Sequence, residues 1–196
     1  YGEIHPFSAN TYSELGRVYA SMELYDKALE CQEKALEIRK SFFGEDHMDV
    51  AWSHGNIGDI YRRQGLYSLA IGNYTKAHKI AKNWYGKEHR EVAETYGSLG
   101  MIYKCMGLYE KALKKYEKEL QIRIKVYGKE HHLFYHTYNN IGNIYLQKQE
   151  YREAMTYYFK SLRISQQVYS ISYPTIAANI RNISLVMKKI DNFAEC

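Results

Sequence analysis

The segment YNNIGNIY, from Tyr138 to Tyr145, carries three asparagines among residues that otherwise suit a helix. Each asparagine costs about 0.5 kcal/mol in a helix relative to alanine, because its amide competes for backbone hydrogen bonds. The same amide is both donor and acceptor, so it can pair with the N–H and C=O groups of an extended peptide. Asn139 and Asn143 share one helical stripe, whereas Asn140 lies one step around the helix. Amides on such a stripe could bind polar groups of a ligand or of a neighbouring helix.

A second arrangement with chemical potential is the pair His132 and His136, whose i, i+4 spacing can hold zinc. A zinc site needs a third or fourth ligand, and Cys105 is the candidate from an earlier segment. Histidines with a structural role in linkers are expected at His5, His47, His89 and His131. The chain has no GxxxxGK phosphate loop, no GxSxG elbow and no HExxH motif. We therefore expect no metal, no cofactor and no enzymatic activity.

The composition indicates a globular chain built of long helices. The 196 residues are 45% hydrophobic, enough for a substantial core, and 2 prolines with 13 glycines leave few helix breakers. The three cysteines are odd in number and lack CxxC spacing, which favours a reduced, cytoplasmic location. No apolar run approaches the roughly 18 residues of a membrane span and no signal peptide opens the chain, so neither membrane insertion nor secretion is expected.

The elements that must position these side chains repeat along the sequence. A shift of 42 residues superimposes YGEIH at Tyr1 on FGEDH at Phe43, and the series continues with YGKEH at Tyr85 and Tyr127 and YSISY at Tyr169. Each complete unit carries the skeleton (Leu or Ile)-Gly-x-x-Tyr, which begins at Leu15, Ile57, Leu99 and Ile141. An aromatic residue follows six positions after its tyrosine, and a small residue three positions later, as in Tyr25 and Ala28.

Each recurrent position has a packing interpretation. The skeleton glycine predicts that two helices cross closely, with the alanine of the second helix as its small counterpart and tyrosines filling the remaining gaps. Gly65 and Gly107 predict turns, while Gly44, Gly86 and Gly128 predict left-handed caps after the second helix. The unit is thus expected to be two antiparallel helices, about residues 6 to 22 and 25 to 42.

The skeleton Tyr12-x-x-Leu15-Gly16-x-x-Tyr19, followed by Ala28, resembles the tetratricopeptide pattern, with tyrosine in place of the usual tryptophan. The 42-residue period is similar to that of kinesin light chain repeats. The chain departs from that pattern in two respects. The linker proline survives at Pro6 and Pro174 alone, and the late alanines Ala35 and Ala77 become Glu119 and Ser161, which predicts looser packing in the third and fourth units.

The resemblance implies an all-α fold, a tetratricopeptide-repeat α-solenoid in which antiparallel helix pairs form a right-handed superhelix. We expect one solenoid domain over residues 1–196, with repeats at about 1–42, 43–84, 85–126 and 127–168 and a partial repeat at 169–196. In that partial repeat a second helix is expected to begin near Phe193. The sequence reads as a piece of a longer protein.

In such repeats the first helix of each unit lines the concave wall. Carried over by alignment, the wall positions hold seven basic and two acidic residues, so the chain's net charge of +5 could be assigned to this wall. The residues expected to form a peptide-binding groove are Asn10, Arg17, Trp52, Asn56, Asp59, Arg62, Met101, Lys104, His136, Asn139, Asn140, Asn143, Leu146, Arg181 and Lys188.

The function implied is that of an adaptor that binds an extended, acidic peptide motif. Asparagines would hold the peptide main chain, basic residues would attract acidic side chains, and Trp52, Met101 and Leu146 would contact apolar side chains. Asn140 has counterparts in Asn56 and Asn182, and the family's asparagine ladder binds peptide backbone. The alternative for this series is that it ties neighbouring helices together.

Other functions remain open at this stage. The array could be a structural spacer or a self-association scaffold, with a homo-oligomer formed through exposed terminal repeats. RNA binding along the basic wall would show a steep dependence on salt. However, most of the 21 tyrosines fall on packing positions and not on a stacking platform, so no nucleic-acid partner is expected.

Overall fold

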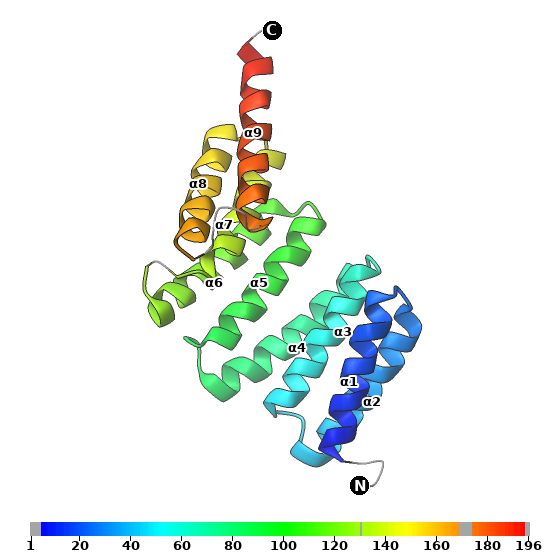
Figure 1. Ribbon diagram of the computed structural model, residues 1–196. Helices are drawn as coiled ribbons and strands as arrows, with labels where there is room; N and C mark the ends of the chain where they lie inside the picture. Colours follow the sequence, from blue (N-terminus) through cyan, green and yellow to red (C-terminus); the bar gives the residue numbers. More distant parts are fainter. Residues whose placement is uncertain (1–4, 130, 169–173, 195–196) are drawn as a thin grey trace.

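The computed structural model describes residues 5–129, 131–168 and 174–194, and these fold into nine α-helices (Figure 1). The helices are α1 (Pro6–Ser21), α2 (Tyr25–Phe43), α3 (Met48–Arg63), α4 (Tyr67–Tyr85), α5 (Arg90–Cys105), α6 (Tyr109–Tyr127), α7 (Phe134–Gln147), α8 (Tyr151–Val168) and α9 (Pro174–Ala194). Each odd-numbered helix from α1 to α7 packs mainly on the helix that follows it, and α1 and α9 lie at opposite ends of the stack. The all-α solenoid and its repeated helix pairs are confirmed.

In the first three units the linker histidine caps the start of the first helix. The Nδ1 atoms of His5, His47 and His89 accept a hydrogen bond from the backbone N–H two residues later, at 3.2, 3.2 and 3.3 Å. Such an N-cap satisfies one of the amides that a helix start leaves unpaired. The His47 and His89 rings also stack on the aromatic residue that ends the preceding helix, Phe43 or Tyr85. The structural role expected for these histidines is therefore observed.

Three glycines end the second helices of the first three units. Gly44, Gly86 and Gly128 have φ of 85°, 83° and 84°, as expected for a glycine cap. Their ψ angles of 166°, −177° and −176° place them in an extended region open almost solely to glycine, and not in the left-handed helical region. The chain therefore leaves each unit in an extended direction toward the next histidine.

The skeleton glycines face large residues. A Cβ added to Gly58, Gly100 or Gly142 would lie 3.2, 2.9 or 2.8 Å from a ring carbon of the tyrosine on the next helix. In the first unit, Gln32 takes the place of that tyrosine opposite Gly16. The close crossing predicted from the sequence is confirmed, but the nearest counterpart is the tyrosine ring and not the alanine. The glycine has this role because a flat ring needs the room that a Cβ would occupy.

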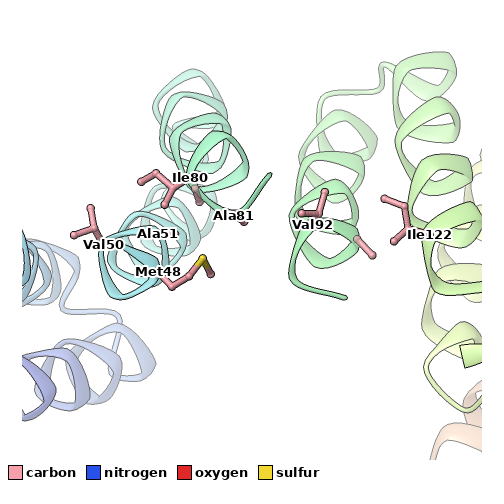
Figure 2. Packing of buried hydrophobic residues seen from close by; sticks show 9 residues of the cluster. Met48, Val50, Ala51, Ile80, Ala81, Val92 and Ile122 are labelled. Carbon is pink, nitrogen blue, oxygen red and sulfur yellow. The ribbon is translucent and has the colours of Figure 1, made fainter. Parts of the chain in front are cut away.

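The core is shared between neighbouring units. One cluster joins buried side chains of four successive helices, α3 to α6 (Figure 2). Its labelled members are Met48, Val50, Ala51, Ile80, Ala81, Val92 and Ile122. Because this cluster takes buried side chains from two successive units, stacking of units and not helix propensity alone stabilises the helices.

The positions where alanine is lost are both buried. Glu119 is 4% exposed and Ser161 is fully buried. The contact between α6 and α7 is less extensive than the other contacts between successive units, in line with the looser packing predicted for the third unit. By contrast, α8 and α9 pack as closely as the earlier pairs, so the expectation fails for the fourth unit. There the Ser161 hydroxyl is small enough to donate to the Tyr135 carbonyl at 2.9 Å without displacing a helix.

The fifth unit differs from the prediction. The first helices of the earlier units end at Ser21, Arg63, Cys105 and Gln147, whereas α9 continues without a turn from Pro174 to Ala194. The second helix expected near Phe193 is therefore not formed. In the earlier units the turn is followed by a second helix that packs on the first.

Candidate functional site

Two pockets lie side by side along the wall formed by the first helices. The α1–α3 pocket, of about 470 Å³, is lined by four predicted residues, Arg17, Asn56, Asp59 and Arg62. The α3–α5 pocket, of about 400 Å³, is lined by Trp52 and again by Asn56 and Asp59. Both volumes fall in the range of ordinary ligand sites, roughly 300–1,000 Å³. The structure thus brings together five predicted residues of the first two units, and Asn10 is the exception.

The α1–α3 pocket carries more positive than negative charge. Arg17 pairs with Glu14 at 2.9 Å, and Arg62 Nε pairs with Asp59 at 3.3 Å. Arg63 also lines the pocket and has no carboxylate partner among the described residues. The Tyr74 hydroxyl donates to Asp59 Oδ1 at 2.7 Å, so this carboxylate already shares its charge with two groups. The pocket can therefore accept an additional anion.

Lys104 extends this basic region toward α7. Its Nζ donates to Asn140 Oδ1 at 2.7 Å, and no carboxylate pairs with it in the part of the chain that the structure describes. Burial lowers the pKa of Lys104, and the nearby Arg62 guanidinium lowers it further. A half-buried ammonium without a counter-ion is stabilised by any anion that approaches it.

The asparagine series connects successive units. Asn56 Nδ2 donates to Ser13 Oγ at 3.1 Å, and Asn182 Nδ2 donates to Asn139 Oδ1 at 3.1 Å, in each case across to the preceding first helix. The residue that Asn140 would meet there is Gly97, which has no polar side chain, so its carbonyl accepts from Lys104 instead. Of the two interpretations open from the sequence, the structure shows the contact between neighbouring helices for all three asparagines.

The two asparagines peculiar to the fourth unit are also engaged through their oxygens. Asn143 Oδ1 accepts from the Tyr158 hydroxyl at 2.7 Å, and Asn139 Oδ1 accepts from Asn182. Their amide N–H groups have no hydrogen-bond acceptor among the described residues and can still donate to a ligand carbonyl. Neither residue lines the α1–α3 or the α3–α5 pocket.

The remaining predicted residues are placed as follows. Asn10 Oδ1 accepts from the buried Arg39 at 2.9 Å and so supports the wall from within. Leu146 packs against the core between α8 and α9, which reduces what it could offer a ligand, and Met101 is half-buried. Exposed positions remain at His136, Arg181 and Lys188, and none of these lines either pocket.

The tyrosine that faces the skeleton glycine recurs in three units, but the hydrogen-bond partner of its hydroxyl differs between them. Tyr74 donates to Asp59 and Tyr158 donates to Asn143, but the equivalent position opposite Tyr116 is Met101. Tyr116 is 1% exposed and its hydroxyl has no hydrogen-bond partner among the described residues. Among the described residues, the third unit therefore holds a buried hydroxyl without a hydrogen-bond partner, whereas the equivalent hydroxyls of the second and fourth units each have one.

This difference predicts opposite responses to the same substitution. Tyr116→Phe should leave stability unchanged or raise it by up to about 1 kcal/mol, whereas Tyr158→Phe should cost about 1 kcal/mol because it removes a made hydrogen bond. Urea unfolding followed by circular dichroism measures both. An equal loss in the two variants would show that the Tyr116 hydroxyl does have a partner.

A metal site receives no support from the geometry. Within residues 5–129, 131–168 and 174–194, no group of three or more His, Cys, Asp or Glu side chains could hold a metal ion. His132 instead lies beside His131, with ring centroids 4.2 Å apart. In the same described residues, no helix is both long and apolar enough to span a bilayer.

Sequence reasoning missed what the second helix contributes. Tyr74, Ala77 and Ala81 of α4 form part of the α3–α5 pocket, although only first helices were expected to line the groove. Space for the pocket comes from Gly55, where an added Cβ would meet no atom within 4 Å. The sequence did contain a signal for this space. The wall position that is Ser13 in the first unit is glycine in the next two, Gly55 and Gly97.

Together these features define a helical-repeat solenoid with an open, polar wall. The chain belongs to the tetratricopeptide repeat family, whose model matches residues 7–83, 53–125 and 91–167. Repeats of this family indicate a protein–protein interaction module. No curated protein sequence matches the chain.

Solved structures of similar fold include kinesin light chain-like repeats. BtubC (BKLC) from P. vanneervenii superimposes with a TM-score of 0.82 at 21% identity, over 94% of this chain and 74% of that one. A "putative kinesin light chain" with nearly identical TPR-like repeats from Podosopora anserina gives a TM-score of 0.78 at 18% identity, over 97% and 90%. Aspartyl phosphate phosphatase F from Bacillus subtilis gives 0.82 at 16% identity, over 96% and 48%. At these identities the likeness is one of fold.

Proposed function

We propose that this chain is a non-enzymatic adaptor that binds an extended peptide along the wall and holds an acidic side chain in the α1–α3 pocket. The single observation that supports this most is the excess of guanidinium groups there: Arg17 and Arg62 each have one carboxylate partner, and Arg63 has none among the described residues. Arginine suits this role because its planar fork of donors matches a carboxylate. The free thiols of Cys31 and Cys105 fit a cytoplasmic location.

Affinity and its salt dependence follow from this chemistry. A short peptide buries less area than a standard protein interface, so we expect a Kd in the micromolar range, about −8 kcal/mol. Much of the selectivity comes from charges at a solvent-accessible wall. Binding should therefore weaken clearly as NaCl is raised from about 50 to 300 mM, because salt screens these charges.

The test is fluorescence anisotropy with a library of labelled nonapeptides that carry Asp or Glu at one fixed position. Arg62→Glu with Arg63→Glu should weaken binding of the acidic peptides by at least about tenfold, because two attractive charges become repulsive. Lys114→Glu with Lys118→Glu, a matched change on the exposed side of α6, should leave binding nearly unchanged. Arg63→Glu alone spares the ion pair with Asp59 and guards against loss of folding. Equal binding by all variants would refute the proposal.

A second candidate is self-association through α9. Four large apolar side chains of this helix are exposed, Ile180, Leu185, Met187 and Ile190. Apolar surface of this kind marks association sites when it is contiguous. Light scattering would show a dimer whose formation is lost in Met187→Glu with Ile190→Glu, while a monomer at all concentrations would leave the adaptor as the sole proposal.

A further inference from the structure

The α3–α5 pocket differs from its neighbour in charge. Three carboxylates line it, Asp59, Glu91 and Glu94, against one guanidinium, Arg90. Glu91 pairs with Arg90 at 2.9 Å. Asp59 accepts a hydrogen bond from the Tyr74 hydroxyl and pairs with Arg62 of the α1–α3 pocket. The sequence count gave the wall a net positive charge. In the structure, the excess charge is positive in the α1–α3 pocket and negative in the adjoining α3–α5 pocket.

Glu94 is the carboxylate of this pocket that has no ion-pair partner within 4 Å among the described residues. In the described part of the chain it makes no hydrogen bond and no ion pair, and its carboxylate lies within the influence of a second acid, Glu91. Partial burial raises the pKa of Glu94, and the Glu91 charge raises it further. Arg123 and Arg90 act in the opposite direction and lower the pKa of Glu94 without cancelling the increase, so a further cation placed against this carboxylate would stabilise its charged form.

The rest of the pocket suits the long side chain that would carry such a cation. Met48, Ala51 and Ala81 form an apolar floor at the edge of the shared core (Figure 2). Trp52, half exposed at 50%, occupies the wall position in α3 that Glu94 occupies in α5. Lysine and arginine bury their methylene stems on apolar surface and place their charge over an indole ring or against a carboxylate.

We propose that the α3–α5 pocket binds a lysine or arginine side chain of the peptide, with its stem on Trp52 and its charge at Glu94. The inference rests on the proposed function, because the same peptide places its acidic residue in the α1–α3 pocket. The two pockets share Asn56 and Asp59 and are therefore contiguous.

The spacing of the motif follows from the architecture. Neighbouring packed helices lie about 10 Å apart, and an extended peptide advances about 3.3 Å per residue. The acidic and the basic residue of the ligand should therefore be about three positions apart. With this spacing, the acidic residue can occupy the α1–α3 pocket while the basic residue occupies the α3–α5 pocket.

The first experiment varies the ligand against Glu94. In the labelled nonapeptides with a fixed Asp, each other position is set in turn to Lys, Gln or Glu. Lys about three positions from Asp should bind at least about tenfold more tightly than Glu there, and Glu94→Lys should reverse that preference. If binding depends on Arg62 and Arg63 but Lys, Gln and Glu bind alike, the inference is wrong while the proposed function stands. If no peptide binds, both are wrong.

The second experiment tests the space itself. Gly55→Leu adds a good helix former where no protein atom lies within 4 Å, so it fills the pocket without disturbing the fold. Gly72→Leu is the matched control, because this α4 glycine also has open space around it and lines neither pocket. We expect the preference for Lys to disappear in Gly55→Leu and to persist in Gly72→Leu. An unchanged preference in Gly55→Leu would overturn the assignment of the pocket.

Trp52 supplies a direct readout. The chain has two tryptophans, so in a Trp84→Phe background the indole of Trp52 is the fluorophore. The Lys peptide should change its emission, and the matching Gln peptide should change it less at equal saturation. Identical spectra for the two saturated complexes would show that the basic side chain does not lie on Trp52.

Discussion

Arg123→Ala is expected to destabilise the protein by about 3 kcal/mol, and the addition of Glu119→Ala is expected to recover most of that loss. Arg123 Nη1 lies 2.8 Å from Glu119 Oε1, and the two side chains are 14% and 5% exposed. The same guanidinium donates to the Leu133 carbonyl at 2.8 Å and to Thr137 Oγ1 at 3.1 Å. Removing it leaves a buried carboxylate without its cation, which costs more than removing both.

The repeat supplies the precedent for the double variant. In the second unit the equivalent positions are Ala77 and Ala81, both buried, and the first-helix residue opposite is glycine in both units. Glu119→Ala with Arg123→Ala therefore gives the third unit an arrangement that the chain already folds. Urea unfolding by circular dichroism measures the three variants, with the exposed Arg152→Ala as control. The explanation fails if the double variant is less stable than Arg123→Ala.

The same pair makes stability depend on pH. Burial raises the pKa of Glu119 from 4.5 to about 7, against the lowering effect of Arg123. Between these values the folded state binds more protons than the unfolded state, so the contribution of Glu119 is full below pH 4.5 and is lost as the pH rises through 7. Relative to wild type, Glu119→Gln should therefore gain stability from pH 5 to pH 8, by about 2 kcal/mol. A constant difference across that range would show that the carboxylate titrates normally.

The sequence predicted the fold well because the 42-residue period records packing. Gly58, Gly100 and Gly142 recur because each leaves room for a tyrosine ring of the next helix, and the histidines His5, His47 and His89 recur because each caps the start of a helix. Such positions have similar surroundings in most of the units. A repeat can therefore be interpreted without knowledge of the three-dimensional neighbours of any single residue.

The candidate site was less predictable because it depends on how units differ. Asn56 and Asn140 occupy equivalent positions, yet one meets a serine and the other a lysine, since Gly97 offers no partner. The charge of a wall position likewise says little until its ion pairs are known: Arg62 has a partner, whereas Glu94 has none among the described residues. Net charge counted along a helix cannot separate these cases.

Gly142→Ala tests the steric basis of the repeat and should destabilise the protein by about 2 kcal/mol. The new Cβ would lie 2.8 Å from two ring carbons of Tyr158, a fully buried side chain that its bond to Asn143 holds in place. Overpacking of this kind costs about 1–3 kcal/mol, more than the roughly 1 kcal/mol that alanine gains over glycine in a helix.

Gly55→Ala is the matched control, since its Cβ would meet no atom within 4 Å, and it should be stabilising by about 0.5–1 kcal/mol. The difference between the two substitutions, measured by urea unfolding, isolates the crowding of the tyrosine ring from helix propensity. If Gly142→Ala were as stabilising as Gly55→Ala, the ring would have room to move. The glycine of each skeleton would then need a reason other than the close crossing of α7 over α8.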